Sequence, residues 1–98
     1  MRMKLHQKGF LLDQISRMAH AWDYELVEKA LSEYGASERY AINTVRVALD
    51  ELAAGGLLQR LEQKLDDGTH LGAGKVLFRY RLTDFGRARM RDTGLLTQ

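Results

Sequence analysis

Three side chains that can hydrogen-bond to the edges of nucleic-acid bases lie close together at Asn43, Thr44 and Arg46. An amide can pair with adenine, a guanidinium can donate two parallel hydrogen bonds to guanine, and a hydroxyl can contact a phosphate or the thymine methyl group. The surrounding apolar residues recur at three- and four-residue steps, which predicts a helix that carries the polar side chains on its outer flank. These apolar residues are Ile42, Val45, Ala48, Leu49 and Leu52.

Residues next to this flank include further groups that could bind a nucleic acid and acids that would repel one. Arg39 and Tyr40, just before the predicted helix, are placed to hold a phosphate backbone, and Val47 shares the outer flank. Asp50 and the acid after it would repel phosphates, so we expect only the first two turns to approach DNA. In the alternative interpretation, Arg46 pairs with Asp50 at a four-residue step, as a surface pair worth roughly a few tenths of a kcal/mol.

Catalytic and metal-binding chemistry find little support in the residues. The chain has no cysteine, which excludes a thiolate zinc site and a cysteine nucleophile. His6, His20 and His70 have no pair at ligand spacing, so we expect no metal. Asp66 and Asp67 are adjacent in a turn, where hydrogen bonding to the backbone explains them better than acid–base catalysis does. We therefore expect no enzyme and no cofactor.

Length and charge indicate one small domain with basic ends. The 98 residues carry 15 Lys and Arg against 13 Asp and Glu, and 45% of them are hydrophobic. Residues 1–10 hold three cations and no acid, residues 71–98 hold six cations against two acids, and residues 21–35 hold four acids against one cation. No apolar run approaches the roughly 20 residues of a membrane span, and the basic start lacks the apolar stretch of a signal peptide. We expect a cytoplasmic protein.

The hydrophobic periodicity predicts an α+β fold with three helices, a two-stranded hairpin and a short closing helix. Helices are predicted over 10–20, from the N-cap Asp23 to Gly35, and from just after Tyr40 to the glycines at 55 and 56. The period then changes to two, with Leu57, Leu61, Leu65, Val76, Phe78, Tyr80 and Leu82 on the apolar side of two strands. The glycine-rich loop 66–74 should project and move, Thr83 should start the last helix, and Gly94 should end it.

Two stretches resemble bacterial transcription regulators of the PadR-like and MarR-like families. Residues 44–58, TVRVALDELAAGGLL, resemble their recognition helix with its Gly-Leu exit into a strand. Residues 80–87, YRLTDFGR, resemble the Tyr-x-Leu-Thr-x-x-Gly segment that closes the PadR wing, and Tyr24 with Glu25 resembles, more weakly, the opening of the second PadR helix. The resemblance covers residues 10–93 and implies a winged helix-turn-helix domain that binds double-stranded DNA, with a basic arm at 1–9 and a tail at 94–98.

The resemblance also implies a second DNA contact, made by the hairpin as a wing on the backbone or in the minor groove. His70 and Lys75 lie in or beside its loop, while Arg79 and Arg81 share the strand face opposite Tyr80. Such contacts would be mainly electrostatic and would weaken steeply with salt. Alternatively, these cations keep an edge strand soluble.

Oligomeric state, effector and partner class stay open. PadR proteins dimerise through a long C-terminal helix without a counterpart here, so we expect a homodimer, if formed, to use the first helix and the arm; the candidate residues are Leu5, Phe10, Leu11 and Met18. A small effector pocket could be built from aromatic rings that are more often core or interface residues in so small a domain, namely Trp22, Tyr24, Tyr34 and Tyr40. The alternative function is a protein–protein interaction module that uses its acidic second helix or the face around Phe10 and Trp22.

Overall fold

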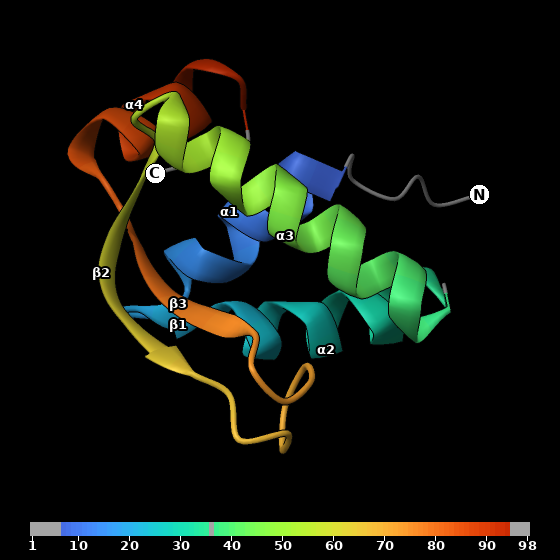
Figure 1. Ribbon diagram of the computed structural model, residues 1–98. Helices are drawn as coiled ribbons and strands as arrows, with labels where there is room; N and C mark the ends of the chain where they lie inside the picture. The colour runs from blue at the N-terminus through green and yellow to red at the C-terminus, as the bar shows by residue number, and fades with distance from the viewer. Residues whose placement is uncertain (1–6, 36, 95–98) are drawn as a thin grey trace.

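The computed structural model describes residues 7–35 and 37–94, apart from the side chains of Tyr34 and Glu38. This part of the chain forms four helices and a three-stranded antiparallel sheet, which confirms the predicted α+β class (Figure 1). The elements in order are α1 (Gln7–Ser16), β1 (Ala21–Trp22), α2 (Asp23–Tyr34), α3 (Glu38–Ala54), β2 (Leu58–Leu65), β3 (Val76–Leu82) and α4 (Asp84–Asp92). None of the described helices combines the length and apolar character that crossing a bilayer requires.

The sheet contains one strand more than the sequence predicts. Its order is β1-β3-β2, with Ala21 of β1 opposite Tyr80 and Trp22 opposite Arg79. A strand of two residues is too short to show an alternating pattern, so the prediction of a two-stranded hairpin alone is wrong. Because β1 leads directly into α2, this pairing fixes the first turn of α2 against β3.

The core lies between the helices and one face of the sheet (Figure 1). Residues from all four helices and all three strands contribute, and those buried most completely include Leu11, Ile15, Leu26, Val45, Leu49, Tyr80 and Met90. Burial of each such side chain contributes about 1.5–3 kcal/mol before entropy costs. Phe10 and Leu11 belong to this core, so the expected dimer surface that included them is wrong. Met18 packs against the same core, and Leu5 lies outside the described residues.

The first helix occupies a different stretch from the predicted 10–20. It begins at Gln7, so residues 7–9 of the predicted arm are helical, while residues 1–6 lie outside the described part. It ends at Ser16, whose hydroxyl donates to the carbonyl of Asp13 at 2.7 Å. The backbone hydrogen bonds that follow span three residues instead of four, since the N–H of Met18 donates to the carbonyl of Ile15 at 3.0 Å. Such local competition for carbonyls ends the helix early.

The connection between α2 and α3 begins at the glycine predicted to end α2. Gly35 ends α2 in the left-handed region at φ 66°, which confirms the predicted helix end. Ser37 caps α3, since its hydroxyl oxygen accepts from the N–H of Tyr40 at 3.3 Å. Arg39 and Tyr40 therefore lie in the first turn of α3 rather than before it, which corrects their expected position.

A bulge in β2 reverses the alternation of its side chains, so that residues two positions apart across the bulge face opposite sides of the sheet. Arg60 pairs with Tyr80, but Glu62 pairs with Arg79, so Leu61 is the extra residue. The alternation reverses across the bulge, which places Arg60 on the helix side and Glu62 on the outer side. Leu61 at the bulge and Leu65 at the loop end of β2 are both exposed, so their predicted position in one apolar row is wrong.

The loop 66–74 is more constrained than its glycine content predicts. The carboxylate of Asp66, only 4% exposed, accepts hydrogen bonds from the backbone N–H groups of Gly68, His70, Leu71 and Gly72. Burial opposes ionisation, but these donors outweigh it and hold the pKa of Asp66 well below its ordinary value. The interpretation of Asp66 and Asp67 as turn-forming residues is confirmed, because Asp67 likewise accepts from the N–H of Thr69 at 3.0 Å.

The start of α4 combines a side-chain cap with a close backbone approach. The hydroxyl oxygen of Thr83 accepts from the N–H of Gly86 at 2.9 Å, which confirms Thr83 as the predicted cap. Gly86 is buried, and a β-carbon there would overlap the carbonyl oxygen of Leu57. The glycine is therefore required for α4 to pack against the end of α3. Gly94 follows the last turn at φ 82°, in agreement with the predicted stop.

We expect Gly86→Ala to lower the free energy of unfolding by about 2–4 kcal/mol, because the backbone must shift to relieve the overlap. Gly55→Ala is the matched control: Gly55 has a negative φ of −82°, and its nearest neighbour would lie 3.4 Å from the new β-carbon. Gly55→Ala should lower the free energy of unfolding by less than about 1 kcal/mol. Urea unfolding followed by circular dichroism measures both, and equal losses would contradict the packing argument.

Candidate nucleic-acid interface

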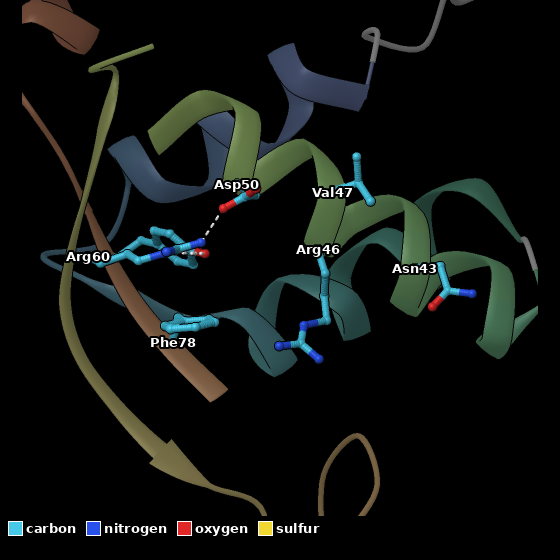
Figure 2. A pocket seen from close by; sticks show the side chains of 7 residues that line it. Asn43, Arg46, Val47, Asp50, Arg60 and Phe78 are labelled. Carbon is cyan, nitrogen blue, oxygen red and sulfur yellow. Dashed lines mark hydrogen bonds and ion pairs between the residues drawn. The ribbon is translucent and has the colours of Figure 1, made fainter. Parts of the chain in front are cut away.

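A groove of about 430 Å³ separates α3 from the helix-facing side of the sheet (Figure 2). We call it the α3 groove, and its lining residues are Asn43, Arg46, Val47, Asp50, Arg60, Phe78 and Tyr80. The first four come from α3, Arg60 comes from β2, and the two aromatic residues come from β3. The α3 groove thus joins the predicted base-reading helix to the predicted wing.

The outer flank of α3 is open over its first three turns. Tyr40 is 61% exposed and Val47 is 58% exposed, and Asn43 between them is also exposed. Their spacing of three and four residues places them in one row along the helix. Arg39 is exposed in the first turn, and Thr44 is half-buried beside the row. The polar flank predicted for Asn43 is therefore present, with Tyr40 and Val47 as its apolar members.

Arg46 lies differently, since it points from α3 towards β3 and α2 (Figure 2). Its side chain is 24% exposed; one terminal nitrogen donates to the carbonyl of Val76, and Nε lies 3.6 Å from a carboxylate oxygen of Asp23. Asp50, the partner expected in the alternative interpretation, pairs with Arg60 instead. The predicted Arg46–Asp50 surface pair is thus wrong, and a base contact would require Arg46 to leave two internal partners.

Asp23, the acidic partner of Arg46, is only 1% exposed. It is the first residue of α2 rather than the predicted N-cap; Trp22 takes that place, and its N–H donates to the carboxylate of Glu25 at 2.8 Å. One oxygen of Asp23 accepts from the N–H of Phe78 at 3.1 Å, while the other has no hydrogen-bond partner. Burial raises the pKa of Asp23, although the N–H of Phe78 and the charge of Arg46 oppose the shift.

Arg60 is the residue of the α3 groove that the sequence did not indicate. Its guanidinium carbon lies 4.2 Å from the ring centre of Phe78, its Nε donates to the hydroxyl of Tyr80 at 3.4 Å, and it pairs with Asp50 (Figure 2). The cation therefore bridges the sheet and α3 over an aromatic surface. The predicted alternation, with Leu57 and Leu61 on the apolar side, would place Arg60 outward, whereas the pairing with Tyr80 places Arg60 on the helix side together with the buried Leu58.

Both acids in the C-terminal half of α3 have cationic partners from other elements. Asp50 pairs with Arg60, and the carboxylate of Glu51 lies 3.0 Å from Nζ of Lys8 in α1. Each pair offsets the negative charge that would otherwise face a phosphate. The expectation that only the first two turns of α3 approach DNA rests on repulsion of phosphates by Asp50 and Glu51, and their ion pairs weaken this repulsion.

The cations predicted on β3 face away from the α3 groove. Arg79 pairs with Glu62 at 2.7 Å, and the Nε of Arg81 donates to the side-chain oxygen of Gln59 at 2.7 Å. Both alternate with Tyr80 and so lie on the outer face of the sheet. The structure therefore does not bring Arg79 and Arg81 together with the outer flank of α3.

His70 and Lys75, the residues in or beside the loop that are predicted to contact DNA, lie in different surroundings. The His70 ring stacks on Tyr24 of α2, with ring centres 3.8 Å apart, whereas Lys75 is exposed immediately before β3. Lys75 precedes Val76, whose carbonyl holds Arg46, but Lys75 does not line the α3 groove, and its side chain lies beside Gly72 of the loop. Of the predicted wing cations, Lys75 is the one that no other side chain of the described residues engages by an ion pair, a hydrogen bond or ring stacking.

The four aromatic residues considered for a small effector pocket do not gather at one site within the described side chains. Trp22 and Tyr24 stack with centres 6.0 Å apart, but Tyr40 lies on the outer flank of α3, and the side chain of Tyr34 is outside the described part. Nor do three potential metal ligands among His, Asp and Glu gather anywhere within the described ranges.

We expect Arg46→Ala to lower the free energy of unfolding by about 2–4 kcal/mol at pH 7, because it leaves the buried carboxylate of Asp23 without its cation. The pKa of Asp23 is higher in the folded than in the unfolded protein, so stability falls as the pH rises through the interval between these two pKa values. The substitution raises this pKa further, so the deficit should shrink as the pH falls from 7 towards 4. Urea titrations of both proteins across this range measure it.

Asp23→Asn in the Arg46→Ala background serves as the control. Removing the stranded charge should recover part of the loss at pH 7 and abolish the pH dependence of the remaining deficit. A deficit that is constant with pH in Arg46→Ala alone would exclude Asp23 as its cause.

Comparison with known proteins adds no identification. No family model, curated protein or solved structure matches the chain. The interpretation of the α3 groove and its open flank rests on the geometry and chemistry described above.

Proposed function

We propose that the chain is a small winged helix-turn-helix protein that binds double-stranded DNA as a transcription regulator in the cytoplasm, without catalytic activity or cofactor. In this proposal α3 enters the major groove and the β2–β3 hairpin forms the wing. The order of elements supports it, because the three helices are followed by the β2–β3 hairpin, to which β1 adds an edge strand. The bacterial families that the sequence resembles use such an arrangement for DNA binding.

The open flank of α3 carries the proposal. Tyr40, Asn43 and Val47 form an exposed row, and the acids that would repel DNA are paired with Arg60 and Lys8. A helix fits the major groove, which is about 12 Å wide, with its N-terminal residues towards the bases. An uncovered helix flank with both polar and methyl groups is the kind of surface that reads base edges.

We assign the first base contact to Asn43, whose amide can pair with adenine. Val47 supplies methyl groups for a thymine methyl, while Arg39 and Thr44 are placed for phosphates. A base contact by Arg46 remains in the proposal as a second step, in which guanine replaces Val76 as its acceptor.

The proposed wing contacts are electrostatic, with Lys75 foremost because it is exposed and no other described side chain engages it. His70, Arg79 and Arg81 are weaker candidates, since each is engaged with another side chain. Binding as a homodimer stays a prediction. It would place half-sites about 34 Å apart on one side of the duplex.

A random-duplex selection at about 50 and 200 mM salt tests the function. We expect one enriched motif, with binding that weakens at the higher salt. Asn43→Ala should cost about 1–3 kcal/mol of binding free energy on this motif and relax preference at one base pair. Lys75→Ala should weaken all duplexes alike and lower the salt slope by about one.

Arg89→Ala on α4 is the matched control for removal of an exposed cation, and it should change neither motif nor salt slope. Fluorescence anisotropy with the selected duplex and a scrambled one provides the affinities. Equal effects of Lys75→Ala and Arg89→Ala would refute the wing assignment, and absence of any enriched motif would refute sequence-specific binding.

A protein–protein interaction module is the second candidate, because Tyr40 and Val47 are large apolar side chains left exposed on one helix. The face around Phe10 is not available for this purpose, since Phe10 is buried. No retention of DNA at either salt concentration would favour this candidate over the first.

A further inference from the structure

We propose that a second cleft, between α2 and the loop 66–74, binds a small organic cation with a flat apolar body, such as an arylalkylammonium ion. The cleft measures about 480 Å³, within the range of small-molecule sites. Its lining residues are Tyr24, Val27, Glu28, Leu31, Thr69, His70 and Leu71. It shares no lining residue with the α3 groove, so the proposal does not depend on DNA binding.

The floor of the cleft is apolar. Val27 is buried in the core, and Leu31 and Leu71 are half-buried and pack against that core. The remaining apolar surface of these two leucines faces a space large enough for a single aromatic ring and a short chain. Covering such surface with an apolar ligand body provides about 25 cal/mol per Å² before binding costs.

The aromatic wall of the cleft is already in place. The rings of Tyr24 and His70 are nearly parallel, at an angle of 12° and with centres 3.8 Å apart. The backbone of His70 and of Leu71 is held in turn by the carboxylate of Asp66. A wall fixed by internal contacts needs little ordering when a ligand arrives.

The charge around the cleft favours a cation. Glu28 is exposed at the cleft and has no ion pair within the described residues. Burial and the negative charges of Glu25, Asp23, Asp66 and Glu28 together raise the pKa of the Tyr24 hydroxyl, in agreement with a negative surrounding. An ammonium ion would offset this charge, whereas a carboxylate would add to it.

The neighbouring rings already attract one cation of the chain itself. Nζ of Lys64 lies 4.5 Å from the ring centre of Trp22 and 5.8 Å from that of Tyr24. Trp22 and His70 each stack on Tyr24, so the ring cluster that holds Lys64 ends at the Tyr24 and His70 side chains that line the cleft. An arylalkylammonium ion has a flat apolar body that can cover the apolar floor of the cleft and a positive charge that can pair with Glu28.

Titration of the full chain with three matched probes tests the proposal: 2-phenylethylammonium, neutral 2-phenylethanol and anionic 3-phenylpropanoate. Two-dimensional amide NMR should show saturable shifts of residues 24–31 and 69–71, with affinity falling from cation to neutral probe to anion. The fluorescence of Trp22, which stacks on Tyr24, gives an independent binding curve.

Variants at the exposed Glu28 separate charge from shape. Glu28→Gln should weaken the cation about two- to fivefold and leave the neutral probe unchanged. Glu28→Lys should make the anion bind more tightly than the cation. Asp92→Asn, an exposed carboxylate on α4, is the control and should alter none of the affinities.

Two results would overturn the proposal. One is the absence of saturable shifts at these residues for the cation. The other is a cation affinity equal to that of the anion, or unaffected by both changes at Glu28. Since no experiment here contains DNA, either result leaves the proposed DNA binding standing, and failure of DNA binding leaves the cleft unaffected.

Discussion

The buried carboxylate of Asp23 connects α2, β3 and α3 at a single point. It accepts from the N–H of Phe78 and lies 3.6 Å from Nε of Arg46, while one of its oxygens has no partner. A charge removed from water is tolerated only when such partners are held in place. The orientation of α3 on the sheet therefore depends on this contact. Its rotation leaves Asn43 and Val47 on the outside, while Arg46 points inwards.

The bulge at Leu61 gives the two faces of the sheet different chemistry. On the helix side Arg60 rests on aromatic rings and neutralises Asp50, while on the outer side Glu62 pairs with Arg79. Because of one extra residue, a cation on the groove side is followed two positions later by an acid on the outer face. In the proposed function, the hairpin would meet a duplex through its loop end rather than through its broad outer face.

The second helix separates two regions of opposite character. Its first residue anchors the α3 groove, whereas Tyr24 and Glu28 face the cleft beside the loop 66–74. The loop itself is organised by Asp66, whose carboxylate replaces the missing side-chain packing of its glycines. Order in a glycine-rich segment arises here from hydrogen bonds to one buried charge, which lowers the entropy cost of forming the cleft.

The sequence by itself determined the local elements, because helix period, left-handed glycine and hydroxyl caps act over a few residues. The α+β class, the helix end at Gly35 and the cap at Thr83 follow from such signals. Only the tertiary structure decided which side chains of α3 are free. Arg46 donates to a carbonyl 30 positions away, and Arg60 faces the groove because it pairs with Tyr80, 20 positions away. Contacts of this range depend on how the elements pack, which no periodic pattern in the chain specifies.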